Sequence, residues 1–285
     1  MNIFINEKKA DITLETEKTL GDVLSGIEQW ISPTGNRIQK ISINDEILPD
    51  DSLSSVFSKD INKIENLNVF ICSFRELATE ALKYLHGICL NYSNSNFNER
   101  KEIISAWENS CAARFLKSDI PDVFRFAGSV FSGEGLEIND FCSLIEERLR
   151  EIGFPDEEII NLESQVKYIV NRMEELPLDI QTGKDRQSGE TIQLFSAMGE
   201  KLFRIFFIYK TYGLSSDNFT VDAKPFSVFM NDFNAALCDL SNAYENRDTV
   251  LIGDAVEYEL APKLFSFFSA LKDVAKSHSP VASMP

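Results

Sequence analysis

The sequence is poor in the residues that most often carry chemistry. Its 285 residues include only two histidines and five cysteines. The cysteines are odd in number, lie far apart and form no Cys-x-x-Cys pair, which argues against a disulfide framework and against a zinc knuckle. We expect them to be small core residues of a protein in a reducing cytoplasm. They are Cys72, Cys89, Cys111, Cys142 and Cys238.

Basic charge is scarce as well. The chain has 28 Lys and Arg residues against 45 Asp and Glu residues, a formal net charge of -17. Such a chain repels a polyanion, so we expect neither nucleic acid nor an anionic lipid surface as a partner. The longest nearly unbroken apolar run, Leu202 to Tyr209, contains Arg204 and is far shorter than the roughly 20 residues that cross a bilayer. Met1 to Glu7 show no signal-peptide pattern, so we expect no membrane insertion.

The first 70 residues alternate between strand and helix patterns. Residues 2–6 and 10–14 alternate as two strands around a polar turn at 7–9, which predicts an opening hairpin. Thr19 is the predicted cap of a helix that ends near Ile31. Further strands are predicted at 38–43, 47–48 and 64–71, and a capped helical turn at 50–56.

The order β-β-α-β-β-β over residues 1–70 resembles the ubiquitin-like β-grasp fold. The resemblance implies one helix across a mixed sheet, and it implies a binding platform rather than a particular ligand. Members of that family that carry sulfur or proteins end in a free Gly-Gly tail. Here Val69-Phe70-Ile71 continues into Cys72 and Ser73, so carrier chemistry is not expected.

From Ser73 onward the apolar positions repeat with the helical period. Pro177 is expected to end one of the helices, and Pro262 to bend another, because its ring crowds the carbonyl of Tyr258. The predicted helices are 74–89, one from Ile103 through Phe115 to about 119, 123–130, 139–153, 155–176, 192–209, 226–244 and 249–276. The expected fold class is α+β, with a β-grasp domain at 1–71, a helical-bundle region at 72–276 and a flexible tail at 277–285. The helical region forms either one bundle or two, at 73–153 and 155–276.

No motif fixes a chemistry. His86, within the first long helix, and His278, in the tail, are interpreted as structural, and the Glu-x-x-His motif of di-iron bundles is missing. Gly133-Glu134-Gly135 is interpreted as a helix connection. Thr182-Gly183-Lys184-Asp185 contains the Gly-Lys pair of a phosphate-binding P-loop. However, Leu178 stands where the first glycine of that loop belongs, and Asp185 replaces the hydroxyl residue that would bind magnesium, which excludes a P-loop nucleotidase. We therefore predict no catalytic residue, no metal and no cofactor.

Three features remain as candidate binding sites. Residues 176–186 are predicted to form a loop of mixed charge, which either caps helices through Asp185 or Ser188 or binds a partner. Asp254, Glu257 and Tyr258 share a helix face, which is either a solvated acidic face or a cation site. The third feature is phenylalanine, 22 residues against 7 tyrosines, in clusters at 203–207 and 265–268. A helix that is apolar nearly all round is either central in a bundle or covered by a partner. The predicted partner-binding residues are Phe203, Phe207, Phe265, Phe268, Asp179, Gln181, Lys184 and Tyr258.

These patterns favour a non-catalytic adaptor or chaperone-like protein that binds a protein partner through apolar helix surfaces. In charge and helix content alone it resembles the small acidic chaperones of flagellar and type III export, which are usually shorter and lack an added β-domain. One alternative is a structural subunit that assembles with itself through the same surfaces. Another is an enzyme whose site consists of scattered Asp, Glu, Lys and Tyr residues.

Overall fold

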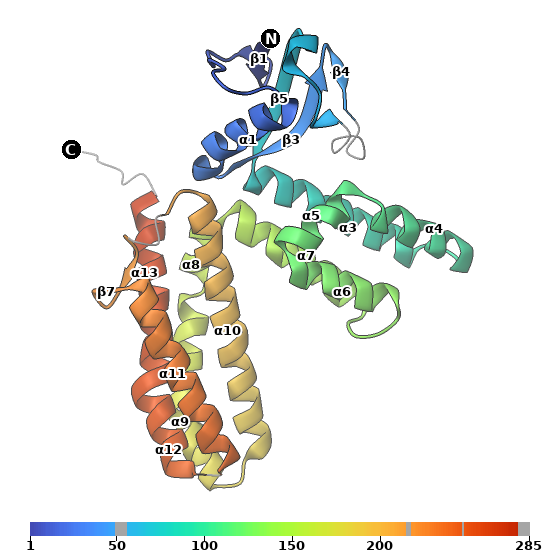
Figure 1. The fold of residues 1–285 in the computed structure, drawn as a ribbon. Coiled ribbons are helices and arrows are strands. Elements are labelled where there is room, and N and C mark those ends of the chain that lie inside the picture. Colours follow the sequence, from blue (N-terminus) through green and yellow to red (C-terminus); the bar gives the residue numbers. More distant parts are fainter. Residues whose placement is uncertain (49–55, 215–217, 247, 279–285) are drawn as a thin grey trace, which may run out of the picture. The chain divides into compact units, whose positions relative to one another are not determined.

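The computed structural model describes residues 1–48, 56–214, 218–246 and 248–278. The chain forms two compact units, one of Met1–Leu149 with Thr211–Gly213 and one of Arg150–Lys210 with Leu214–Pro285. The predicted α+β class is confirmed, because a small N-terminal α/β domain is followed by a mostly helical region (Figure 1).

The N-terminal domain is a five-stranded mixed sheet with one long helix, α1 (Leu20–Ile31), on one face. The strands are β1 (Asn2–Ile5), β2 (Lys8–Lys9), β3 (Asn36–Ile43), β4 (Glu46–Ile47) and β5 (Asn66–Ser73). They lie in the order β2-β1-β5-β3-β4, with β1 and β5 parallel and the other pairs antiparallel. The apolar stripe of α1 packs on inward-facing strand residues such as Ile41, Leu67 and Val69. Short 3-10 turns at Ser32–Thr34 and Ile61–Lys63 complete the domain.

The start of α1 was predicted correctly. The Thr19 hydroxyl accepts a hydrogen bond from the backbone N–H of Asp22, and the Asp22 carboxylate accepts one from the backbone N–H of Thr19 at 2.9 Å. This reciprocal capping box satisfies two N–H groups that a helix start leaves without partners.

The predicted strand at 10–14 is wrong. β2 ends at Lys9, and after the Ala10 N–H, which donates to the Ile3 carbonyl, the chain leaves β1 and continues as irregular backbone. The hairpin turn lies at Asn6 and Glu7, which both have left-handed φ angles, of 48° and 66°, as a two-residue type I′ turn requires. Most of the helical turn predicted at 50–56 lies outside the described residues.

Five helices follow, the last of which begins in the first unit and ends in the second, so that its residues 150–153 belong to the second unit. They are α3 (Phe74–Ser93), α4 (Phe97–Glu108), α5 (Cys111–Asp119), α6 (Pro121–Phe131) and α7 (Ile138–Gly153). The single helix predicted from Ile103 to about 119 is wrong, because the chain breaks between α4 and α5. There the Ser110 hydroxyl accepts a hydrogen bond from the Ala113 N–H at 3.0 Å and caps a new helix.

The second unit is a bundle of long helices (Figure 1). Its elements are α8 (Pro155–Asn161), α9 (Glu163–Gln181), α10 (Asp185–Thr211), a hairpin of β6 (Thr220–Val221) and β7 (Lys224–Pro225), α11 (Phe226–Glu245), α12 (Thr249–Asp254), a π-helical segment (Ala255–Leu260) and α13 (Ala261–His278). The hairpin was not predicted. Ser277 and His278 are helical, so the predicted tail begins too early, and residues 279–285 lie outside the described residues.

Two prolines lie inside helices of this unit. Pro177 does not end α9, which continues to Gln181, and a side chain at Gly253 of α12 would lie 3.3 Å from the Pro177 ring. Pro177 therefore removes one backbone hydrogen bond without ending α9, and its ring packs closely against α12. Before Pro262 the helix widens into the π-helical segment instead of breaking. The wider turn lies at the Tyr258 carbonyl, where the ring was expected to cause crowding.

Phenylalanines fill the core of the second unit. Phe206 of α10 is 1% exposed, and its ring lies 4.1 Å from that of Phe226, 4.9 Å from that of Phe219 and 6.1 Å from that of Phe267. The next residue, Phe207, is 56% exposed. Adjacent positions on a helix differ in direction by about 100°, so burial of the first ring turns the second outward.

We expect Phe206→Ala to destabilise the second unit by about 3–5 kcal/mol, because the cavity cannot collapse among so many rings. Phe207→Ala, at an exposed position, should cost about 0.5 kcal/mol. The measurement is urea unfolding followed by far-UV circular dichroism. Tryptophan fluorescence serves as a control for the first unit, because both tryptophans, Trp30 and Trp107, lie in that unit. Similar losses in the two variants would contradict this placement of α10.

Candidate functional site

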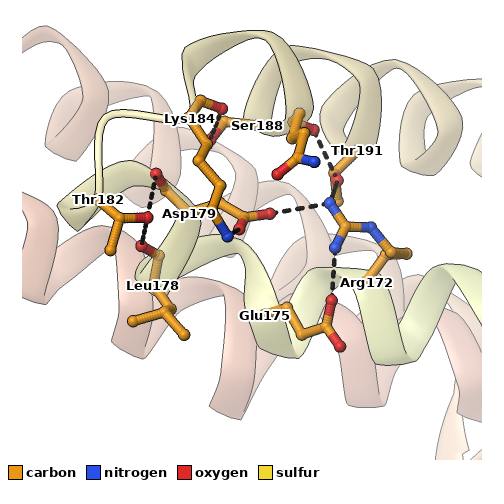
Figure 2. A network of polar contacts seen from close by, with 9 residues as sticks. Arg172, Glu175, Leu178, Asp179, Thr182, Lys184, Ser188 and Thr191 are labelled. Atoms are coloured by element: carbon orange, nitrogen blue, oxygen red, sulfur yellow. Dashed lines mark hydrogen bonds and ion pairs between the residues drawn. The ribbon is translucent and has the colours of Figure 1, made fainter.

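The most buried charge in the predicted site segment is Asp179 of α9, which is 3% exposed (Figure 2). Its Oδ2 accepts a hydrogen bond from Arg172 Nη2 at 2.9 Å, and its Oδ1 accepts one from Lys184 Nζ at 3.0 Å. Arg172 Nη2 also donates to Thr191 Oγ1 of α10 at 3.1 Å. The network joins α9 to the first turns of α10.

The loop predicted at 176–186 is wrong, because α9 continues to Gln181 and α10 begins at Asp185. Only a tight turn separates them. Gly183 has a left-handed φ of 71°, and the Lys184 N–H reaches back to the Asp179 carbonyl at 2.8 Å. This arrangement is the usual glycine-dependent end of a helix. Gln181 is exposed at the end of α9.

The electrostatics of Asp179 indicate a structural role. The hydrogen bonds that the Asp179 carboxylate accepts from Lys184 and Arg172 lower the pKa of Asp179. The hydrogen bond between Arg172 and Asp179 also raises the pKa of Arg172. Both carboxylate oxygens have a cationic donor, so the group stays ionised near neutral pH. A carboxylate held in this way is a poor proton acceptor, and it fixes α9 against α10.

Arg172 contacts two carboxylates, the buried Asp179 and the exposed Glu175, so each can be replaced by its amide and the two variants compared. Asp179→Asn should lower the melting temperature of the second unit, whereas Glu175→Gln, whose side chain is 61% exposed, should change it little. Because the pKa of Asp179 is lowered, its contribution to stability is present above its ordinary value of 3.8 and is lost as pH falls through the folded-state pKa. The difference between wild type and Asp179→Asn should therefore shrink from pH 7 to pH 3 when melting is followed by circular dichroism. A difference that grows on acidification would contradict the assignment.

A second buried carboxylate, Glu151 of α7, is 0% exposed. It accepts two hydrogen bonds from Arg204 of α10, from Nε at 3.1 Å and from Nη2 at 2.9 Å. Lys201 Nζ lies 3.9 Å from Glu151 and 3.2 Å from Glu158. This bidentate pair is again fully occupied, so it connects helices rather than offering a reactive group.

The two histidines also contact carboxylates. His278 ends α13, with its Nδ1 3.4 Å from Asp156 Oδ1, the same oxygen that accepts a hydrogen bond from the Tyr209 hydroxyl at 2.7 Å. Burial raises the pKa of Tyr209. His86 Nε2 lies 3.4 Å from Glu146 Oε1. These positions agree with the structural interpretation of both histidines.

The described ranges contain neither a metal-binding cluster nor a membrane-spanning helix. No group of three or more His, Cys, Asp or Glu side chains there is placed to hold a metal ion, the acidic face beside Tyr258 included. None of the helices in those ranges combines the length and the apolar character needed to cross a membrane.

All five cysteines are described, and each is a thiol. Only Cys89 is buried, whereas Cys111 and Cys238 are exposed, so the expectation of core cysteines is wrong for these two. Cys89 of α3 shares a hydrogen bond with Cys142 of α7. Burial raises the pKa of Cys89 to about 12 and, together with the charge of Glu76, raises that of Cys72 to about 11.

Thiol alkylation tests this burial. At pH 8 iodoacetamide should modify Cys238 readily and Cys89 at least about tenfold more slowly, because the thiolate is the reactive form and Cys89 is both covered and protonated. Peptide mass spectrometry after timed quenching measures both rates in one sample. In urea the two rates should converge, and equal rates in the native protein would contradict the packing of α3 on α7.

The predicted aromatic binding residues separate into inner and outer positions. Phe268 is 2% exposed and belongs to the core, and the ring of Phe203 lies 4.8 Å from that of Phe267. Phe265 is 39% exposed, and Tyr258 is 66% exposed. No ring contact among the described residues joins Phe207 to either of these two.

Tyr258 of the π-helical segment and Pro262 and Phe265 of α13 follow one another at spacings of four and three residues, and all three are exposed. We call these three residues the α13 stripe. The charge of Glu257, with its hydrogen bond and a weaker effect of Asp254, raises the pKa of the Tyr258 hydroxyl, which therefore stays protonated as a donor.

A groove in the N-terminal domain was not predicted. It has a volume of about 500 Å³ and lies between α1 and the irregular segment that follows β2. It is lined by Ala10, Asp11, Ile12, Thr13, Leu14, Glu17, Asp22, Val23, Gly26, Ile27 and Trp30. The available sequence signal was Trp30, an aromatic residue of the predicted helix that lies off its buried apolar stripe.

Comparison with known families covers two parts of the chain. A family model described as the TP0873 N-terminal domain matches residues 1–73, and one described as a domain of unknown function (DUF8042) matches residues 157–268. The first match ends where β5 passes into α3, and the second runs from α8 into α13. A search of curated proteins and a search of solved structures each gave no match.

Proposed function

We propose that the protein is a non-catalytic cytoplasmic protein that binds another protein through apolar helix surfaces of its second unit. The observation that carries this proposal is the exposure of the α13 stripe above a core that the chain already fills. Phe267 and Phe268 are buried on the inner side of α13, while Phe265 on its outer side and Tyr258 in the preceding π-helical segment are exposed. A helix that is apolar on both sides has a second surface that a partner can cover.

The charge around the stripe indicates the chemistry of this partner. Asp254, Glu257 and Glu259 lie close to Tyr258 in the sequence and are exposed. Glu259 pairs with Lys263, so Asp254 and Glu257 carry the acidic charge beside Tyr258. An amphipathic helix with an apolar face and flanking lysine or arginine residues complements such a surface. The chain's net charge of -17 attracts the same kind of segment over a longer range.

We infer in addition that the N-terminal domain is a ubiquitin-like β-grasp domain. This inference is supported by the strand order, the parallel pair β1 and β5 at the centre of the sheet, and the single long helix on one face. Ser73 both ends β5 and caps α3, so the last strand continues into a helix instead of a free tail. This continuity favours a platform over a carrier.

Photo-cross-linking in cells of the source organism tests the helix surface. A p-benzoylphenylalanine residue at position 258 or 265 should give an adduct of one common mass. The control position is Tyr168 of α9, which is 57% exposed and should give no such adduct. Phe265→Asp should reduce the adduct formed from position 258, because a charge on the stripe opposes apolar contact.

Circular dichroism must first show that Phe265→Asp melts as the wild type does. An adduct of twice the chain mass would identify a second copy of this chain and so favour the self-assembling subunit, which light scattering would also detect. Equal labelling from positions 168 and 265 would contradict the proposed surface.

A further inference from the structure

The groove of the N-terminal domain has one regular wall and one irregular wall. The regular wall is α1, which contributes Asp22, Val23, Gly26, Ile27 and Trp30. Trp30 is 65% exposed, so most of a large aromatic side chain stands at one end of the groove without cover. The volume of about 500 Å³ falls within the usual range for ligand sites.

Gly26 makes room in this wall. It lies in the middle of α1, and no described atom lies within 4 Å of a Cβ atom built there. A glycine inside a helix costs roughly 0.5–1 kcal/mol relative to alanine, and nothing in the fold requires it at this position. The groove is therefore open above Gly26 on the side from which another chain can approach.

The irregular wall offers backbone hydrogen-bonding groups. Within the described part of the chain, no backbone hydrogen bond joins residues 11–14 to another residue. These residues follow β2, which is an edge strand of the sheet. Unpaired N–H and C=O groups beside a sheet edge pair readily with an extended segment of another chain.

The polar part of the groove is acidic. Asp11, Glu17 and Asp22 contribute carboxylates, and the lining contains no lysine or arginine. Backbone N–H groups of residues 15–17 lower the pKa of Glu17, and those of Thr19 and Lys18 lower the pKa of Asp22, so both carboxylates are charged near neutral pH. The apolar floor is formed by side chains such as Leu14, Val23 and Ile27.

We propose that this groove binds an extended segment of another protein, which carries a large apolar side chain next to a lysine or arginine. The apolar side chain lies over Gly26 and against Trp30, and the basic group faces Asp11, Glu17 and Asp22. The segment pairs with the backbone of residues 11–14. This interface lies in the first unit and is independent of the α13 stripe.

Nuclear magnetic resonance of the full-length chain tests the proposal, with the two tryptophan indole N–H signals as reporters. The probe is a capped octapeptide of alternating lysine and valine in which leucine replaces one of the central valines. It should shift the Trp30 signal saturably and leave the signal of Trp107, a 2% exposed residue, unchanged. The same peptide with glutamate in place of lysine should bind at least about tenfold more weakly.

Gly26→Leu is the decisive variant, because it fills the groove while favouring the helix. It should weaken binding of the basic peptide at least about tenfold. The matched control is Gly87→Leu in α3, another helical glycine with no atom within 4 Å of a built Cβ, and it should bind as the wild type does. Asp11→Lys should also weaken binding.

Three results would overturn the proposal. The Trp30 signal could fail to shift, the two peptides could bind equally, or Gly26→Leu could bind the basic peptide as strongly as the wild type. The last result would show only general attraction between a basic peptide and an acidic chain. Thermal melting of Gly26→Leu, followed by tryptophan fluorescence, verifies that the first unit, which contains Trp30 and Trp107, stays folded.

Discussion

Burial of the Phe206 ring among the rings of Phe219, Phe226 and Phe267 decides which surfaces of the second unit stay exposed. That contact fixes the rotation of α10 about its own axis, and so it turns Phe207 toward solvent. Packing of Phe267 in the same cluster fixes α13 and leaves the α13 stripe outside. The exposed aromatic side chains are thus a consequence of how the core is filled.

Buried ion pairs connect the packed helices at defined positions. Asp179 with Arg172 and Lys184 sets the approach of α9 to α10, and Glu151 with Arg204 attaches the end of α7 to α10. Each buried carboxylate has its oxygens occupied by cationic donors. Desolvation offsets much of the attraction within such pairs, but removal of one partner would leave an uncompensated buried charge.

Local signals in the sequence predicted the elements whose causes are local. Thr19 and Ser73 cap helices through side chains a few residues away, and the apolar stripes of α1, α3 and α10 are visible as periodicity. The predictions from the sequence were wrong where a contact between distant residues, or the local backbone conformation, determined the structure. Pro177 lies inside α9 with its ring packed against Gly253 of α12, a contact that no spacing around residue 177 reveals. Phenylalanines on both sides of one helix gave no way to tell core from surface, and the groove depends on how α1 lies on the sheet.

The junction at Ser73 has a mechanical consequence. One residue is both the end of β5 and the cap of α3, and two cross-links stiffen the joint: the Phe74 N–H donates to the Gly35 carbonyl at 3.1 Å, and Arg37 pairs with Asp119 at the end of α5. The chain therefore has no slack between sheet and helix. With no loop residue between them, the last strand and the helix that follows it cannot change direction independently at this point.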